Sequence, residues 1–183
     1  MEAKTIAAGK ELSWVKPVQF VIAVVFAFSY ISLGLPQIFT GPVVNALLLI
    51  VAMRIGLGPA IFLGMMTPVA AFLSRVLPIS LVLMLPFIML GNAIFVSVYK
   101  TISQKMNKPL SLAVAAAAKF ALLYAAVLVL VYKPLTIVIG TAPQAVSVPG
   151  FVLNMMGYMQ IITALIGGSA AIAILSVLDS KKK

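Results

Sequence analysis

The sequence predicts an all-α integral membrane protein with six transmembrane helices and with both the N-terminus and the C-terminus in the cytoplasm. Of the 183 residues, 63% are hydrophobic and 9% are charged, and the mean hydropathy is +1.21. A soluble domain is about half apolar and about a quarter charged. The apolar residues form stretches close to the about 20 residues that a spanning helix needs. Pro, Gly and basic residues separate six such stretches.

The chain divides into three parts. Residues 1–17 are an amphipathic lead on the cytoplasmic surface, with Trp14 expected at the depth of the lipid headgroups. Residues 18–178 form the six-helix transmembrane domain, and residues 179–183 are a basic cytoplasmic tail.

The six spans follow one another with short connections, except before the last. Pro68 and Pro86 are expected to kink their helices, because proline removes a backbone hydrogen bond. The segment 133–149 either stays outside or partly re-enters the membrane. The spans are expected at Val18 to about Gly34, roughly Pro42–Arg54, Pro59 to about Leu77, Ile79 to about Lys100, Leu110 to about Tyr132 and Gly150 to about Leu178.

The basic residues indicate the orientation. With the N-terminus inside, ten of the 13 Lys and Arg residues face the cytoplasm, Arg75 and Lys133 face outward, and Lys119 lies within the fifth span. Cytoplasmic loops carry an excess of Lys and Arg, so this asymmetry favours two cytoplasmic termini. Orientation therefore explains the net charge of +10, and nucleic acid is not expected as a partner.

The composition excludes several kinds of chemistry. The chain has no Cys, no His and three acidic residues, so it lacks the side chains of disulfides, thiol nucleophiles, imidazole bases and most zinc or haem sites. It also has no Walker motif for nucleotide binding. We therefore expect no enzymatic activity, no metal site and no cofactor.

Polar residues interrupt the apolar stretch from Gly41 to Tyr99 and recur near the later spans. In hydrocarbon an unsatisfied polar group is costly, so such residues face the protein interior or a cavity. The alternative to a binding site is that Asn residues in spans two, four and six hydrogen-bond one another between helices. The candidate ligand-binding residues are Gln37, Asn45, Asn92, Lys119, Asn154 and Tyr158.

Lys119 is the most informative single residue. It lies nine residues into the fifth span, which is roughly 14 Å along a helix and near the midplane of a core about 30 Å thick. The acidic residues, Glu2, Glu11 and Asp179, are all near the cytoplasmic ends. Three alternatives remain: Lys119 extends to the cytoplasmic surface, it is deprotonated, or an anionic ligand supplies the missing charge.

Small residues one helical turn apart let two helices approach closely. Ala23 and Ala27 form such a pair in the first span, which is either a partner-binding face or a result of ordinary alanine content. Longer sets in the last two spans are expected to be internal packing seams. They are Ala113, Ala117, Ala121 and Ala125 in span five, and Ala164, Gly167, Gly168 and Ala171 in span six.

Six short helices, two cytoplasmic ends, the chain length and the Ala23-xxx-Ala27 motif together resemble the substrate-binding S component of an energy-coupling-factor (ECF) transporter. The segments GPVVNALLL and PFIMLGNAIF are similar to those of small uncharacterised members of that superfamily, and the resemblance covers nearly the whole chain. It implies that Ala23 and Ala27 contact a transmembrane T component, which couples to two cytoplasmic ATPase subunits. It also implies a vitamin or micronutrient pocket toward the outer face, under the loop Leu35–Gly41 and between helices four to six.

The resemblance thus implies a subunit of the bacterial cytoplasmic membrane, surrounded by lipid, that captures a small molecule for ATP-driven uptake. The outer half lacks acidic and Trp residues, which leaves the substrate open, with anionic compounds included, and disfavours strongly cationic ones. One alternative is a structural or assembly subunit of a membrane complex, which needs no ligand. A further alternative is an intramembrane enzyme built on Lys119, which the missing His, Cys and mid-membrane acids weaken.

Overall fold

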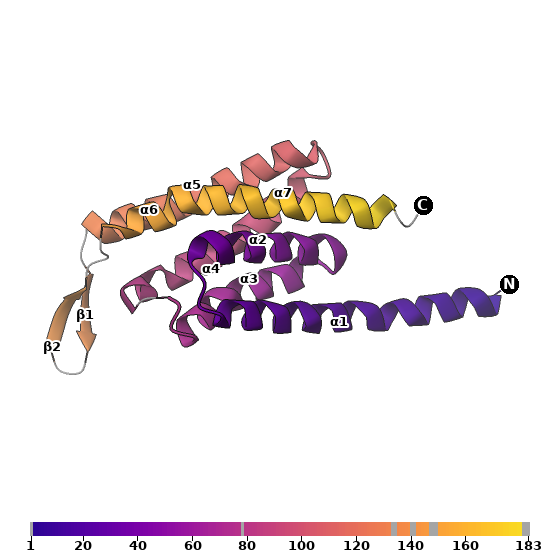
Figure 1. The fold of residues 1–183 in the computed structure, drawn as a ribbon, viewed down its shortest axis with the longest axis horizontal. Helices are drawn as coiled ribbons and strands as arrows, with labels where there is room; N and C mark the ends of the chain where they lie inside the picture. Colours follow the sequence, from indigo (N-terminus) through magenta and orange to yellow (C-terminus); the bar gives the residue numbers. More distant parts are fainter. Residues whose placement is uncertain (1, 78, 133–134, 140–141, 147–149, 181–183) are drawn as a thin grey trace.

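Helices make up most of the molecule and form an elongated bundle (Figure 1). The computed structural model describes residues 2–77, 79–132, 135–139, 142–146 and 150–180, with side chains described outside 2–13, 79–80 and 135–146. In chain order the elements are α1 (Glu2–Ser32), α2 (Gln37–Arg54), α3 (Leu57–Leu73), the 3-10 helix η1 (Ile79–Met84), α4 (Leu85–Ile102), α5 (Lys108–Tyr132), β1 (Leu135–Ile139), β2 (Ala142–Val146), α6 (Val152–Met156) and α7 (Tyr158–Ser180).

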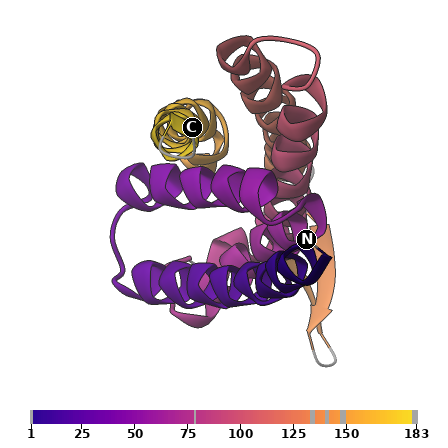
Figure 2. The same ribbon diagram turned by 90° about the vertical axis from the view of Figure 1, so that its right-hand side faces the viewer.

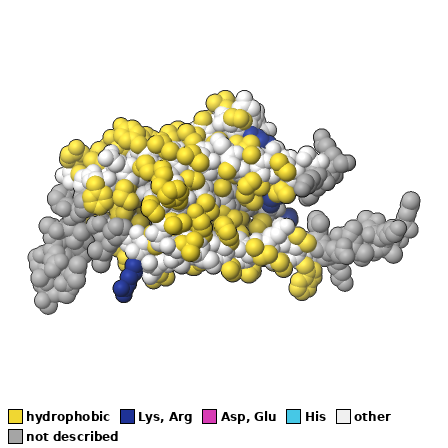
Figure 3. Space-filling model, in the orientation of Figure 1, with side chains coloured by type: hydrophobic (Ala, Val, Ile, Leu, Met, Phe, Trp, Pro, Cys, Tyr) yellow, Lys and Arg dark blue, Asp and Glu magenta, His cyan; other side chains and the backbone are white. Residues whose placement is uncertain are grey.

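Five helical segments of the described chain are long and apolar enough to cross a membrane. A sixth helix, α3, is equally apolar but has only 17 residues. Figure 3 shows that hydrophobic side chains cover most of one face, while Lys and Arg side chains lie near its two ends. The protein is therefore an α-helical membrane protein.

The two termini lie at the same end of the bundle, and the strands β1 and β2 lie at the other end (Figure 1). The C-terminal helix α7, seen almost end-on in Figure 2, packs against α2 and α5. On the other side α4 packs between α3 and α5, and α1 packs on α2 and α3. Helix α2 thus contacts its chain neighbours α1 and α3 and the more distant α4 and α7, which places many of its side chains in the interior.

The connection between α5 and α6 contains a β-hairpin, where the sequence predicts either an external loop or a re-entrant segment. The strands β1 and β2 pair antiparallel, from Leu135 opposite Val146 to Ile139 opposite Ala142. The sequence LTIVI of β1 is rich in β-branched residues, which favour extended backbone. This local preference was the signal for a strand. Lys133 and Lys181–Lys183 lie outside the described residues.

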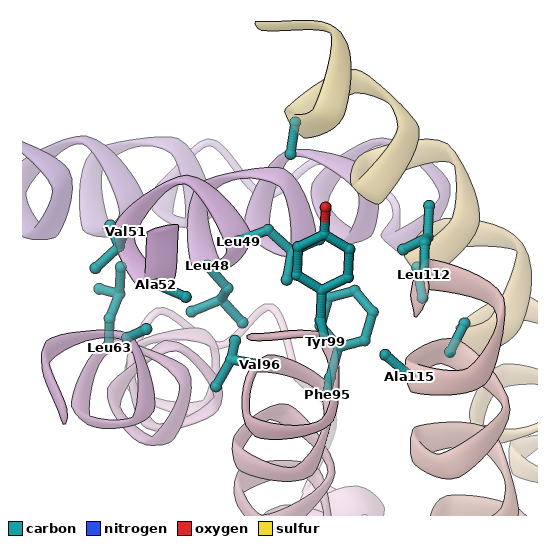
Figure 4. Close-up of a cluster of buried hydrophobic side chains, with 14 of the residues drawn as sticks. Leu48, Leu49, Val51, Ala52, Leu63, Phe95, Val96, Tyr99, Leu112 and Ala115 are labelled. Carbon is teal, nitrogen blue, oxygen red and sulfur yellow. The ribbon is translucent and has the colours of Figure 1, made fainter. Parts of the chain in front are cut away.

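The main hydrophobic core joins α2, α3, α4 and α5, and Figure 4 shows its side chains pointing toward one another. Leu48 and Leu49 of α2 meet Leu63 of α3 and Phe95 of α4, and each of these four side chains is fully buried. A second cluster, nearer the hairpin, joins η1 to α5 and α6. Its buried members are Leu81, Met84, Leu123, Ala126, Val127, Leu130, Val152 and Met156.

The small residues of α7 form an internal packing seam, as the sequence predicted. Ala164, Gly167, Gly168 and Ala171 are all buried. A Cβ atom on Gly167 would collide with the backbone of Pro42, and one on Gly168 would collide with the Leu112 side chain. Because glycine has no side chain, these two positions allow α7 to approach α2 and α5 closely.

The expectation for span five was wrong, because Ala113, Ala117, Ala121 and Ala125 are exposed on the outer face of α5. The buried face carries Lys119 instead. Ala117 and Ala121 are each two residues from Lys119, which is about 200° around a helix. A buried lysine therefore turns the alanine row outward.

Two further expectations need correction. Pro86 does not kink a helix but occupies the first turn of α4, directly after η1, where its missing N–H leaves no hydrogen bond unmade. Ala23 and Ala27 do not face outward: they are 7% and 1% exposed and belong to the main core. They are packed against this chain itself, so they are not available to a partner. Helix α1 also runs through Pro17 without a break.

Bulk at Ala27 should destabilise the isolated protein, whereas bulk at Ala117 should not. Overpacking a core costs about 1–3 kcal/mol, and an exposed substitution changes stability by about 0.5 kcal/mol or less. We expect Ala27→Trp to lower the melting temperature of the detergent-solubilised protein clearly, and Ala117→Leu to leave it nearly unchanged. Equal melting temperatures for the two variants would contradict the packing of α1.

Candidate functional site

The centre of the site is the ammonium group of Lys119, which lies inside the bundle. Lys119 is 3% exposed, and its Nζ donates hydrogen bonds to Asn45 Oδ1 of α2 and Asn92 Oδ1 of α4, each at 2.8 Å. Nζ also lies 5.4 Å from the centroid of the Phe95 ring, within the range of a cation–π interaction. The side chain therefore does not extend to the surface, and it links three helices.

Asn92 extends this network to a fourth helix. Its Nδ2 donates to the backbone oxygen of Gly64 in α3 at 2.8 Å and lies 3.5 Å from Thr67 Oγ1. Thr67 Oγ1 in turn donates to the same Gly64 oxygen at 3.2 Å. A Cβ atom at Gly64 would lie 3.0 Å from Asn92 Cβ, so glycine is what lets α3 approach α4 this closely.

A cavity of about 590 Å³ extends from this network to the end of the bundle opposite the termini. Lys119, Asn45 and Asn92, all nearly fully buried, form its deep part. The remaining walls come from the α1–α2 connection, the N-terminal half of α2, the end of α3 with the segment after it, the first half of α4, the end of α6 and the start of α7. Lining residues outside the network include Gly34, Pro36, Val44, Ala71, Ile88, Met155 and Met156.

Arg75 lies at the exposed part of this cavity and has unusual backbone geometry. Its φ is 57°, the left-handed region. Helix α3 ends there in a Schellman motif, in which Arg75 N donates to Phe72 O and Val76 N donates to Ala71 O, each at 3.0 Å. This position usually holds glycine, because another residue pays roughly 1–2 kcal/mol in strain. Glycine would end the helix at a lower energetic cost, so helix termination does not explain an arginine at this position.

Gln37, at the start of α2, joins two walls of the cavity. Its Nε2 donates to Met155 O of α6 at 3.2 Å. Its Oε1 is buried and has no hydrogen-bond partner among the described residues. Because buried polar atoms are nearly always paired, this oxygen marks a position where a donor is missing.

The structure brings together four of the six residues that the sequence singled out for ligand binding. Gln37, Asn45, Asn92 and Lys119 all line the cavity. Asn154 and Tyr158 do not line it: both are exposed, and Tyr158 is 63% exposed with its ring near Phe120. Helix α6 ends at Met156 and the chain turns at Gly157 before α7 begins. Asn154 and Tyr158 therefore lie on different helices and do not share one helical face.

Five further polar residues line the cavity but are not among the six ligand-binding candidates of the sequence: Thr40, Thr67, Ser74, Arg75 and Gln160. Gln160 is 7% exposed, and its Nε2 lies 3.8 Å from Met156 Sδ. The signal for Thr67 was its position beside Pro68 in an otherwise apolar helix. Arg75 offered only its charge, because a left-handed backbone at arginine cannot be read from sequence.

No known protein family, no curated protein and no solved structure matches this chain.

The Lys119 network should contribute measurably to stability. Asn92→Leu leaves Lys119 with one fewer acceptor, which should cost about 1–3 kcal/mol of unfolding free energy. In a Lys119→Met background the same change should cost less, with an interaction energy of at least about 0.5 kcal/mol in a double-mutant cycle. Thr163→Val is the control, since Thr163 Oγ1 donates only within α7, to Gln160 O. Additive effects of the first two substitutions would contradict the network.

Proposed function

We propose that the protein is the substrate-binding S component of an ECF-type transporter in the bacterial cytoplasmic membrane. It captures a small vitamin or micronutrient from outside and depends on a transmembrane T component and two cytoplasmic ATPase subunits for uptake. The observation that carries the proposal is the cavity of about 590 Å³ that leads from one end of the bundle to Lys119. Ligand cavities in proteins are typically about 300–1,000 Å³, with apolar walls and few polar groups.

The proposed topology has six crossings, with α3 as the short one, and both termini in the cytoplasm. An even number of crossings agrees with two termini at one end of the bundle (Figure 1). Basic residues at that end support the orientation. Arg54 pairs with Asp179 at 2.8 Å and donates to Leu175 O of α7, and Lys100 donates to Ala52 O of α2 at 2.8 Å. Cations beside the last carbonyls of helices are electrostatically favourable.

With this orientation the cavity faces outward, on the side from which a scavenged nutrient arrives. The α1–α2 connection lines it, in agreement with the pocket that the resemblance implies under the first loop. The resemblance also implied that Ala23 and Ala27 contact the T component. Both are buried in this chain, so the proposed contact with the T component falls to other residues.

Purification tests the proposal directly. The detergent-solubilised chain should retain a water-soluble small molecule in a near-stoichiometric amount and should hydrolyse no ATP alone. Coexpression with T and ATPase subunits should yield a complex whose ATP hydrolysis drives uptake of that molecule into vesicles. A chain that holds no small molecule and joins no such complex would contradict the proposal.

A structural or assembly subunit is the second candidate, and one observation favours it. Lys119, Asn45, Asn92 and Thr67 hydrogen-bond between helices without any ligand, as a purely structural polar network does. The two functions differ in whether they require the cavity: a capture subunit needs it to hold its ligand, and a structural subunit does not. Filling it with Val44→Trp should abolish ligand retention in the first case and leave complex assembly unchanged in the second.

The proposed orientation predicts the outcome of reporter fusions. A reporter fused to the C-terminus should be active only in its cytoplasmic form, and one inserted between β1 and β2 only in its external form, because basic residues are retained inside. Alkaline phosphatase and green fluorescent protein fusions provide the measurement. An externally active C-terminal fusion would mean an odd number of crossings.

A further inference from the structure

We propose that the ligand of this cavity is a small organic anion that also carries a separate hydrogen-bond donor. Lys119 binds the anionic group, Arg75 attracts the anion at the exposed part of the cavity, and Gln37 accepts from the donor. This inference rests on the proposed capture function, and it specifies the chemical class of the ligand. Carboxylates and phosphates share the required chemistry.

The charge inventory of the cavity is the first argument. Two basic residues line it, Lys119 in the deep part and Arg75 at the exposed part, and no acidic residue is among the described residues that line it. Of the three acids in the chain, Asp179 pairs with Arg54 at the end of the terminal helices, and Glu2 and Glu11 belong to the N-terminal part of α1. The protein therefore provides no counter-charge within the cavity.

The hydrogen bonds of Lys119 are the second argument. An ammonium group has three N–H donors, and two of them go to the neutral oxygens of Asn45 and Asn92. These oxygens orient the group but carry no net charge. A buried cation is favourable only with a well-placed anion, and the third N–H remains for an acceptor on the ligand.

Arg75 provides the third argument. Its left-handed backbone position favours glycine, yet the residue is arginine. A guanidinium binds carboxylate or phosphate through two parallel hydrogen bonds. At the exposed part of an apolar cavity it also raises the local concentration of anions and hence their rate of entry.

Gln37 determines the other end of the ligand. Its Nε2 is fixed by Met155 O, which leaves the buried Oε1 as an acceptor without a donor in the described chain. A hydroxyl or an N–H on the ligand satisfies it. Between these polar positions the walls are apolar, with Val44, Ile88 and Met156, so the body of the ligand is apolar or planar.

The first experiment identifies the class of the copurified molecule. The full chain is purified in detergent, and its aqueous and organic extracts are analysed by mass spectrometry in both ion modes. A water-soluble anion with an O–H or N–H group is expected. A neutral or cationic molecule would overturn this inference and leave the capture function standing, and a phospholipid would assign the cations to a lipid headgroup instead. An empty protein that no probe stabilises would overturn both proposals.

The second experiment uses variants and defined probes. Lys119→Met should reduce the retained amount of the molecule at least 10-fold, and Lys119→Arg should also reduce it, because a planar fork does not replace a compact ammonium. Arg75→Gly should reduce retention several-fold while the melting temperature stays equal or rises, since glycine suits the backbone. Gln37→Leu should act on retention in the same direction as Arg75→Gly. Lys105→Met, an exposed loop lysine, is the matched control.

Thermal shifts with 4-hydroxybenzoate, benzoate and 4-hydroxybenzamide separate the two features of the ligand. We expect stabilisation of the wild-type chain in the order 4-hydroxybenzoate, benzoate, 4-hydroxybenzamide, and loss of this order in Lys119→Met. Stabilisation by the amide equal to that by the acid would overturn the anionic part. Normal retention of the copurified molecule by Lys119→Met would overturn the assignment of Lys119.

Discussion

A polar group inside a membrane must find its partners within the protein, because lipid chains offer neither donors nor acceptors. Lys119 is the most demanding such group in this chain. Its ammonium meets oxygens from α2 and α4, and Asn92 passes the connection on to the backbone of α3. One lysine on α5 thus fixes the relative positions of four helices. Because Lys119 is buried, the opposite face of α5 turns outward, and this is the face that carries the row of alanines from Ala113 to Ala125.

The same network forms the deep part of the cavity. Two neutral amides orient the ammonium without neutralising it, and this leaves the group ready for a further acceptor. The apolar core of Leu48, Leu63, Phe95 and their neighbours lies on the side of the termini. It holds the helices together there, which lets them separate around a cavity at the other end. An inert anchor needs neither the lysine nor the space beside it.

The cavity differs chemically along its length. Its deep part is cationic and enclosed, its exposed part carries an arginine on a strained backbone, and Gln37 bridges α2 to α6 between them. The end of α1 meets the segment after α3 beside the cavity, where Ser32 Oγ and Ser74 Oγ lie 3.2 Å apart. Residues from seven helices, α1 to α7, contribute to the walls, so relative movement of the helices would change access to the deep part.

Composition and hydropathy determined that this is a helical membrane protein, and local patterns correctly indicated the approximate helices and the seam of α7. Gln37, Asn45, Asn92 and Lys119 could also be selected from the sequence, because polar residues are expensive in hydrocarbon wherever they occur. The same rule selected Asn154 and Tyr158, which are exposed, since it identifies polar residues but not the direction in which each one points.

Direction was decided by tertiary packing. The pairs at Ala23 and Ala27 and at Ala117 and Ala121 have the same spacing, yet the first is buried and the second faces outward. Spacing fixes only which residues share a helical face. Which face turns inward depends on what the neighbouring helices present, and for α5 this was the pair of asparagines that Lys119 requires.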